Sequence, residues 1–276
     1  MAIAVSEKAM RLGSFSSDVL FILYPSMKIN LVLSGGAVRG IAHIGVIKAL
    51  EELGFEIVGV SGVSAGALVG AFYCAGYTPE EMLKIVKDRE WIRYIKPRIP
   101  KLGFFSLLKG EKFLRKYLKV DRIEELKKEF HVCALDIITG KTIYFSEGDL
   151  YRIVLGSCAL PGIFEPVRYK HFLLVDGGVT NNLPVEPFLK RDIPVVGVDV
   201  NPMDPADRPK NIVSILLRSF VLAIRSNVEK RKELCNFLIV PELERYSLHN
   251  LWKVDEIYQL GYRKGLEVMK RFINEQ

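Results

Sequence analysis

The sequence predicts one α/β domain in three α/β/α layers, with a mostly parallel central sheet covered by helices on both faces. Three observations predict this fold. Short apolar runs typical of buried strands alternate with longer segments whose apolar residues recur at helical spacing. Glycine-rich turns connect several of these runs to the next helix. The 276 residues, 49% hydrophobic and 26% charged, have an ordinary globular composition, which excludes a disordered chain.

Two strand–turn–helix units open the pattern. Residues 29–33 are apolar except for Asn30 and predict a buried strand, and residues 41–53 carry apolar side chains at helical spacing. Residues 56–60 and 65–75 repeat the unit. At residues 78–81 a capping Thr, a Pro and two Glu mark the start of a further helix. Such repeated units place successive strands parallel to one another.

The rest of the chain adds two short helices and then alternates again. Helices are expected at residues 111–118, 122–130, 149–158, 212–234 and 255–272. Strands are expected at residues 131–138, 141–145, 172–175, 194–200 and 237–240. Because neither an internal repeat nor a linker-like stretch interrupts the pattern, we expect a single domain over residues 27–276.

Two segments depart from the pattern. Residues 1–26 precede the first strong strand and are expected to be an N-terminal extension, with translation from Met27 as an alternative. Residues 90–120 mix aromatic residues, prolines and lysines without a clean period. We expect them to form an irregular basic insertion. In sequence it lies between Ser64 and Asp176, the two candidate catalytic residues, where a cap or lid would be placed.

The chain has a formal net charge of +7, and the excess is concentrated. Residues 84–131 hold fifteen Lys and Arg against seven Asp and Glu, so the remainder is close to neutral. Such an excess favours an anionic partner, either a nucleic acid or a membrane surface. No nucleic-acid-binding motif is present, so no nucleic-acid partner is expected.

Cysteine usage and hydropathy indicate the compartment. The four cysteines are far apart and form no C-x-x-C pair, which argues against a disulfide scaffold and against a zinc site. No window reaches the roughly 18 consecutive apolar residues of a spanning helix. We therefore expect a cytoplasmic protein, with peripheral membrane contact as an extension of that expectation.

Gly62-Val-Ser-Ala-Gly66 carries the sharpest catalytic signal. It follows an expected strand and opens an expected helix, which is the setting of a nucleophilic serine on a tight turn. Gly62 and Gly66 suit that turn because a Cβ would clash with neighbouring backbone. The turn would expose Ser64 Oγ at the carboxyl edge of the sheet, where the helix dipole favours negative charge. A structural turn that merely contains a serine is the alternative.

A second glycine turn, Gly35-Gly-Ala-Val-Arg-Gly40, follows the first strand. A dinucleotide loop would need G-x-G-x-x-G with an acidic residue after the next strand, and a Walker loop would need Gly-Lys-Ser/Thr; neither is present. Two interpretations stay open. One is an oxyanion hole, with the N–H groups of Gly35, Gly36 and Ala37 directed at a developing alkoxide. The other is a plain tight turn. Arg39 would fix the loop or contact an anionic head group.

Asp176 is the candidate base. It ends an apolar strand and precedes Gly177 and Gly178, which leave room for the carboxylate to reach a neighbouring loop. Asn181 and Asn182 would hold that loop in place. A carboxylate at the carboxyl end of a strand lies in the same layer as the serine turn.

Two ways of activating Ser64 are open. In a triad a histidine takes the proton and an aspartate orients it, and the order Ser64, Asp176, His249 would suit an α/β-hydrolase. Yet no glycine and no strand end mark the surroundings of His249, and His43 sits one turn into a helix, where packing is the usual role. In a dyad Asp176 itself is the base. These surroundings favour the dyad.

Together the three clusters resemble the patatin-like phospholipase family, whose pattern is a glycine-rich oxyanion loop, then G-x-S-x-G, then D-G-G or D-G-A. A fourth family block is similar to residues 157–164, Ser-Cys-Ala-Leu-Pro-Gly-Ile-Phe. The four blocks occur in order, and the resemblance extends over residues 28–190.

The resemblance implies a serine lipid acyl hydrolase of phospholipase A or lysophospholipase type, which uses neither a metal nor a cofactor in acyl transfer. Ser64 would be the nucleophile and Asp176 the general base. The oxyanion donors and supporting residues would be Gly35, Gly36, Ala37 and Ala65, with Arg39, Gly40, Gly62, Gly66, Gly177 and Gly178. Ala37 stands where the family often has glycine, a mild change provided that its φ is negative.

The expected partner is a lipid or another acyl ester. Residues 84–128 set Lys and Arg beside aromatic residues such as Trp91 and Phe104, a combination that suits an anionic bilayer. An ordinary solvated basic face is the alternative. A histidine-triad esterase or thioesterase and a lipid-binding module with little turnover are the competing functions, and the sequence assigns no oligomeric state.

Overall fold

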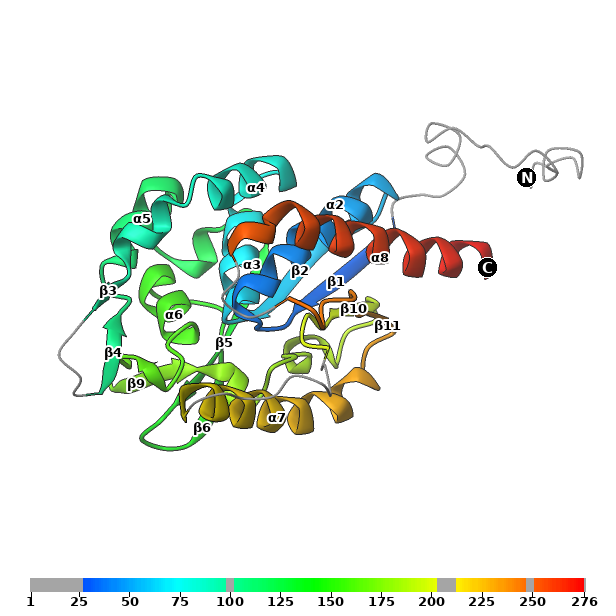
Figure 1. The fold of residues 1–276 in the computed structure, drawn as a ribbon. Helices are drawn as coiled ribbons and strands as arrows, with labels where there is room; N and C mark the ends of the chain where they lie inside the picture. Colours follow the sequence, from blue (N-terminus) through cyan, green and yellow to red (C-terminus); the bar gives the residue numbers. More distant parts are fainter. Residues whose placement is uncertain (1–26, 98–101, 203–211, 247–250, 276) are drawn as a thin grey trace, which may run out of the picture.

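A computed structural model describes residues 27–97, 102–202, 212–246 and 251–275 (Figure 1). The predicted extension, residues 1–26, lies outside the described residues. Within them, the chain alternates between strands and helices around a central sheet, as its sequence predicts.

The central sheet has eight strands. Seven follow the order β11-β10-β1-β2-β5-β9-β8, and the eighth, β6, lies off this path and pairs with β5. Their bounds are β1 Lys28–Leu33, β2 Glu56–Val63, β5 Glu129–Asp136, β6 Lys141–Phe145, β8 Val167–Tyr169, β9 Phe172–Asp176, β10 Val195–Val198 and β11 Phe237–Ile239. The five strands from β11 to β5 are parallel. β6 and β9 are antiparallel to β5, and β8 is antiparallel to β9. The predicted mostly parallel sheet is confirmed, with an antiparallel edge that the sequence pattern did not reveal.

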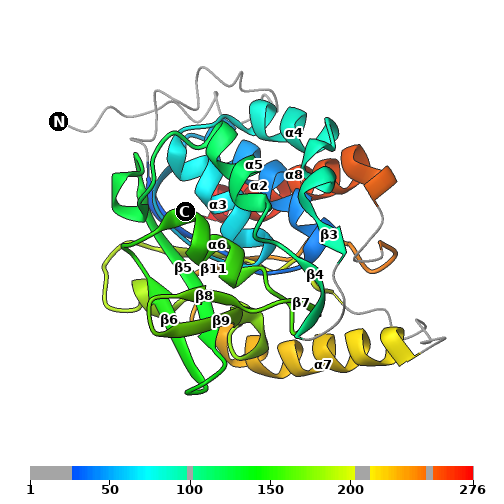
Figure 2. The same cartoon turned by 90° about the vertical axis from the view of Figure 1, so that its left-hand side faces the viewer.

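Helices cover both faces of this sheet, unequally (Figures 1 and 2). The fuller face carries α2 (Ile41–Glu52), α3 (Ala65–Ala75), α6 (Leu150–Ser157) and α8 (Val254–Glu275). α7 (Ile212–Lys232) lies on the other face (Figure 1). Successive residues of β1 supply both layers: Leu31 and Leu33 join the larger core, whereas Val32 packs with Val195 and Ile224 in the smaller one.

The strand order reverses between β1 and β10. From β1 the chain proceeds through β2 to β5, whereas β10 and β11 lie on the opposite side of β1. Right-handed crossovers in the two directions place their helices on opposite faces, which is why α2 and α7 are separated by the sheet. Such a reversal leaves a crevice at the carboxyl ends of the strands, where ligands of open α/β sheets bind.

The predicted insertion, residues 90–120, contains regular structure. It includes η2 (Glu90–Tyr94), β3 (Lys96–Pro97), β4 (Gly103–Ser106) and α5 (Gly110–Tyr117), and it follows α4 (Pro79–Lys87). β4 pairs with β3 and with β7 (Gly162–Phe164), which gives a second, three-stranded sheet. The short strands come from distant parts of the sequence, so no local period could reveal them.

One predicted helix, over residues 122–130, is wrong. Only the single 3₁₀ turn η3 (Ile123–Glu125) forms there, and Leu126 is already extended. β5 begins at Glu129, where pairing with β2 buries Phe130 to 2% exposure. The tertiary contact therefore overrides the local helical spacing.

Candidate active site

Ser64 lies on a sharp turn between β2 and α3. Its φ of 53° and ψ of −122° are uncommon for a residue with a side chain, and such strain is typical of functional turns. The turn is tight because Gly62 and Gly66 allow it: a Cβ on Gly62 would lie 2.5 Å from the Gly66 carbonyl oxygen, and one on Gly66 would overlap the Leu33 carbonyl. Both glycines therefore have the supporting role that the sequence predicts.

Two residues at the end of α6 hold this turn from outside. The Ser64 N–H donates to Ser157 Oγ at 2.8 Å, and the Ser157 hydroxyl donates in turn to the Cys133 carbonyl at 2.6 Å. Cys158 Sγ lies 3.3 Å from the Ser64 carbonyl oxygen. Because Ser157 is fully buried, this relay fixes the strained backbone without solvent.

Asp176 ends β9 and faces Ser64. The Ser64 hydroxyl is near enough to lower the pKa of the carboxylate, and Asp176 Oδ1 accepts a hydrogen bond from the Gly178 N–H at 2.8 Å. Asp176 is 4% exposed, and burial raises its pKa to about 6, although both interactions act in the opposite direction. The carboxylate that the sequence places in one layer with Ser64 thus interacts with that serine.

The glycine loop after β1 lies against the same turn. A Cβ on Gly35 would come within 3.0 Å of Ser64 Cβ. The Gly35 N–H donates to Asn182 Oδ1 at 3.1 Å, and the Gly35 carbonyl accepts from Asn201 Nδ2 at 2.6 Å. The expectation that the Gly35 N–H serves an oxyanion is therefore corrected, because that donor already has a buried partner.

The other expected donors stand at helix starts. Gly36 precedes η1 (Ala37–Gly40), Ala37 is its first residue, and Ala65 is the first residue of α3. N–H groups at a helix start have no partner within the helix. The φ of Ala37 is 48°, so the condition of a negative φ is not met, and the side chain stands in a conformation that glycine adopts more easily.

Arg39 binds backbone rather than an open surface. Its guanidinium donates to the carbonyls of Tyr246 (2.6 Å), Pro202 (3.1 Å) and Glu244 (3.4 Å). Of the two roles open in the sequence, the structure shows loop fixation: Arg39 joins η1 to the segments that follow β10 and β11.

The remaining predicted glycines sit at close approaches. A Cβ on Gly40 would lie 2.5 Å from Ala65 Cβ, and one on Gly177 would lie 2.6 Å from the Cys133 carbonyl oxygen. On Gly178 it would lie 2.6 Å from Asn182 Oδ1 and 3.0 Å from Asp176 Oδ1. These glycines let the three loops around Ser64 converge.

Three of the four histidines have partners other than Ser64. His43 is fully buried, donates from Nε2 to the Ser34 carbonyl at 2.8 Å, and has a pKa lowered by burial to about 4, so it is a neutral packing residue. His131 bonds to Glu129 at 2.6 Å, and the His171 ring lies against Phe172. His249 lies outside the described residues.

Sequence reasoning missed Ser157 and Asn201. Asn182, predicted only to hold its own loop, bridges to the β1 loop through Gly35. Ser157 stands in the fourth motif block and Asn201 follows the end of β10, so membership of a motif and position after a strand were the available signals. Their partners are 93 and 166 residues away in sequence, beyond the reach of any local pattern.

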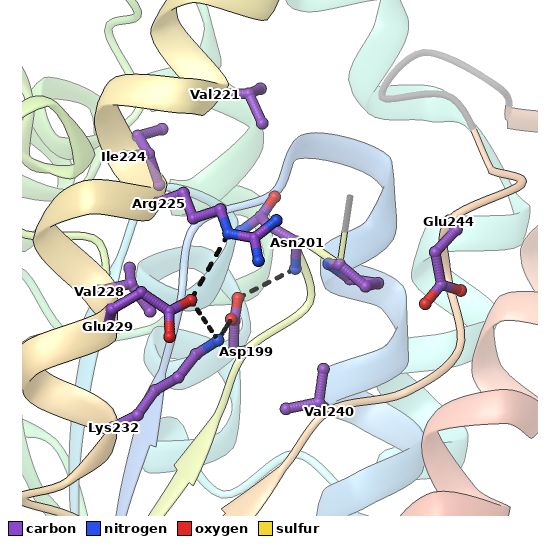
Figure 3. A pocket seen from close by; sticks show the side chains of 11 residues that line it. Asp199, Asn201, Val221, Ile224, Arg225, Val228, Glu229, Lys232, Val240 and Glu244 are labelled. Atoms are coloured by element: carbon purple, nitrogen blue, oxygen red, sulfur yellow. Dashed lines mark hydrogen bonds and ion pairs between the residues drawn. The ribbon is translucent and has the colours of Figure 1, made fainter. Parts of the chain in front are cut away.

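A polar pocket of about 280 Å³ lies beside the glycine loop (Figure 3). Asn201, which binds Gly35, is part of its wall, and Lys232 bridges Asp199 and Glu229 at 3.1 Å each. Neither Ser64 nor Asp176 lines it. Across the described ranges, no group of three or more His, Cys, Asp or Glu is arranged to hold a metal ion.

For residues 27–97, 102–202, 212–246 and 251–275, no helix combines the length and apolarity that crossing a bilayer requires.

The chain is similar to several known proteins. An uncharacterized NTE family protein of Mycobacterium tuberculosis is 37% identical over 167 residues, which are 59% of this chain and 46% of that protein. Lysophospholipase nte1 of Aspergillus terreus is 30% identical over 285 residues, 90% of this chain but 18% of the relative. The chain thus spans less than half the length of these curated relatives. The crystal structure of VipD from Legionella pneumophila shares the fold, with a TM-score of 0.54, 15% identity, and coverage of 91% of this chain and 67% of VipD.

A family model supplies the most direct assignment. The model described as patatin-like phospholipase matches residues 31–189, which run from β1 past β9 and contain both Ser64 and Asp176. The chain belongs to the patatin-like phospholipase family.

Proposed function

We propose that this protein hydrolyses acyl esters of lipids, with Ser64 as nucleophile and Asp176 as general base. The buried Asp176 carboxylate beside the Ser64 side chain carries the proposal, because the serine hydroxyl lowers the pKa of that carboxylate. A nucleophile and a base within hydrogen-bond reach are the minimum that acyl transfer to a serine needs. Family membership supports the lipid substrate, and lysophospholipase nte1 is similar over 90% of this chain.

The proposed reaction proceeds through an acyl-enzyme. Ser64 Oγ attacks the ester carbonyl carbon while its proton passes to Asp176. The tetrahedral intermediate collapses, the ester C–O bond breaks, and Asp176 returns the proton to the leaving alcohol. Water then attacks the acyl-serine with Asp176 again as base, which releases the fatty acid and restores the Ser64 hydroxyl.

The N–H groups of Gly36, Ala37 and Ala65 are the proposed oxyanion donors. Each stands at the start of a helix, where N–H groups lack intrahelical partners and the helix dipole favours negative charge. Gly35 contributes differently: its bonds to Asn182 and Asn201 hold the loop in shape. Removing one oxyanion donor typically costs about 2.7–4 kcal/mol of barrier, so the shape of this loop matters to the rate.

The pKa of Asp176 suits this role. At about 6, the carboxylate is ionised at neutral pH yet more basic than an exposed aspartate, which improves proton transfer from a hydroxyl. The burial of Asp176 beside the Ser64 turn is therefore what raises its basicity.

Release of fatty acid from lysophosphatidylcholine, and of alcohol from a short-chain ester, tests the proposal. Wild type should release both products, and Ser64→Ala should release neither. Ser61→Ala is the matched control, because Ser61 is a buried serine on β2, the strand that leads into the Ser64 turn, and its hydroxyl has no protein partner among the described residues. Equal activity in wild type and Ser64→Ala would refute the proposal, whereas binding of lipid without turnover would favour a lipid-binding module.

A further inference from the structure

We propose that the protein docks on anionic bilayers through the edge of the molecule at which the parallel strands end, so that the Ser64 site faces the lipid. This proposal rests on the proposed function, since it supplies the surface from which a lipid ester would enter. We call this surface the docking edge. Its apolar members are the exposed side chains of Leu102, Phe104, Ile138, Ile215 and Trp252.

Chain topology places these residues at one edge. Ile138 follows the end of β5, which is parallel to β2 and therefore ends beside Ser64. Ile215 lies in the first turns of α7, which follows the end of β10. Trp252, 81% exposed, belongs to η6 (Leu251–Lys253), which comes after β11 and before α8. The carboxyl ends of parallel strands share an edge, so the segments that follow them emerge there.

β4 and the residue before it contribute two exposed apolar side chains. Leu102 is 63% exposed and Phe104 is 52% exposed. β4 pairs with β7, which follows the Ser157–Cys158 segment that contacts Ser64. In Figure 1, β3, β4, the β5–β6 turn and the first turns of α7 all lie on the left, and Figure 2 looks onto this side.

The opposite edge supplies a natural comparison. Leu189 and Leu234 are 46% and 47% exposed, and they shortly precede β10 and β11. They therefore emerge where the strands begin, away from Ser64. Single exposed apolar residues are ordinary on protein surfaces, whereas a gathering around one edge marks an interaction site.

Charge identifies the occupant as anionic. Arg93 shortly precedes β3, and Lys109 and Lys112 follow β4; all three are exposed and make no ion pair within the described part of the chain. Two acids of the same segment are already paired: Glu90 with Lys116, and Glu111 with Arg115 and Arg152. Exposed aromatic and leucine side chains among unpaired cations match a bilayer with anionic head groups, where apolar groups insert and cations stay at the surface.

Vesicle pelleting on the Ser64→Ala background measures docking without any hydrolysis. The vesicles are phosphatidylcholine alone, or phosphatidylcholine with an equal share of phosphatidylglycerol. Binding should favour the anionic vesicles and should weaken as salt rises. Lys109→Gln and Lys112→Gln should each lower the affinity for anionic vesicles about fivefold. Leu102→Ser with Phe104→Ser should lower it at least about tenfold.

Leu189→Ser with Leu234→Ser is the matched control, and it should bind like its parent. The proposal is overturned if the parent does not pellet with anionic vesicles, or if the control pair loses as much affinity as the Leu102 and Phe104 pair. Failure of the proposed function would appear elsewhere, as wild-type protein that hydrolyses no ester whether or not vesicles bind.

Discussion

Asp176 combines two properties that oppose each other. Its burial makes the ionised form costly, while the Ser64 hydroxyl and the Gly178 N–H stabilise that form. Burial prevails, so the pKa of Asp176 stands at about 6 rather than at the ordinary 3.8 of an aspartate. The burial that makes Asp176 more basic also destabilises the fold once the carboxylate ionises. Activity and stability therefore depend on the same titration.

The first prediction concerns activity against pH. If Asp176 is the base, kcat/KM for a short-chain ester rises with pH and reaches a plateau above about pH 6, because only the carboxylate accepts the proton from Ser64. Asp176→Asn should lower kcat by about 10²–10⁴-fold across the range. A wild-type profile that is flat from about pH 4 to about pH 8 would contradict this assignment.

The second prediction concerns stability against pH. Below the ordinary aspartate pKa, Asp176 is protonated in both folded and unfolded chains. No charge is then buried, so the ionisation of Asp176 does not lower stability. As pH rises, the unfolded chain ionises first, so wild type loses stability until the folded pKa near 6 is passed. Asp176→Asn escapes this loss and should be more stable by about 2–3 kcal/mol at neutral pH. Urea unfolding of both proteins at acid and neutral pH measures it, and a gain that does not grow with pH would count against it.

The third prediction concerns Ser157. Ser157→Ala leaves the Ser64 N–H without its acceptor and the Cys133 carbonyl without its donor. Stability should fall by about 1–3 kcal/mol, with a lower kcat because the nucleophile turn is no longer fixed. Ser61→Ala removes an equally buried hydroxyl that has no partner among the described residues, so it should not lower stability. Equal effects of the two substitutions in urea unfolding would refute the relay.

Close packing of α2 on α8 completes the larger core. The two helices approach through glycines: a Cβ on Gly45 would overlap the Tyr258 carbonyl, and one on Gly261 would overlap the Ala42 carbonyl. Side chains at these positions would push the helices apart, although the sequence pattern alone shows only helices with apolar faces.

The fourth prediction tests this crossing. Gly261→Ala should destabilise the protein by about 1–3 kcal/mol or more, because the new methyl group meets backbone that cannot rotate away. Gly110→Ala, at the start of α5, is the control, since its Cβ would meet only the flexible end of Leu155 at 3.1 Å. Thermal unfolding of the two variants compares them directly. If the Gly261→Ala protein has the same melting temperature as wild type, α2 and α8 pack less closely than this crossing implies.

Elements differed in how well the sequence predicted them. Strands of the parallel core, such as β1 and β2, were predictable because both of their faces are buried and they are rich in valine, isoleucine and leucine. β4 and β7 were not, because three or four residues carry no period and pairing across distant sequence creates them. The helix predicted at residues 122–130 failed because pairing with β2 recruits Phe130 into β5.

The reversal of strand order accounts for the position of the candidate site at the carboxyl ends of the parallel strands. Loops after β1 and β2 bring Gly35 and Ser64 to one edge, and β9 delivers Asp176 from an antiparallel strand. Glycines and strand ends predicted that Ser64 and Asp176 lie in one layer. The sequence did not predict that the Gly35 N–H is taken by Asn182, because that contact depends on how two distant loops meet.

In the proposed mechanism, Ser64 and Asp176 act together without a histidine. Labelling of the purified protein with a fluorophosphonate probe tests it directly, in wild type, Ser64→Ala, Asp176→Asn and His249→Ala. Wild type and His249→Ala should label, and Ser64→Ala and Asp176→Asn should not. If His249→Ala stays folded and fails to label, or if Ser64→Ala labels like wild type, the Ser64–Asp176 account is contradicted.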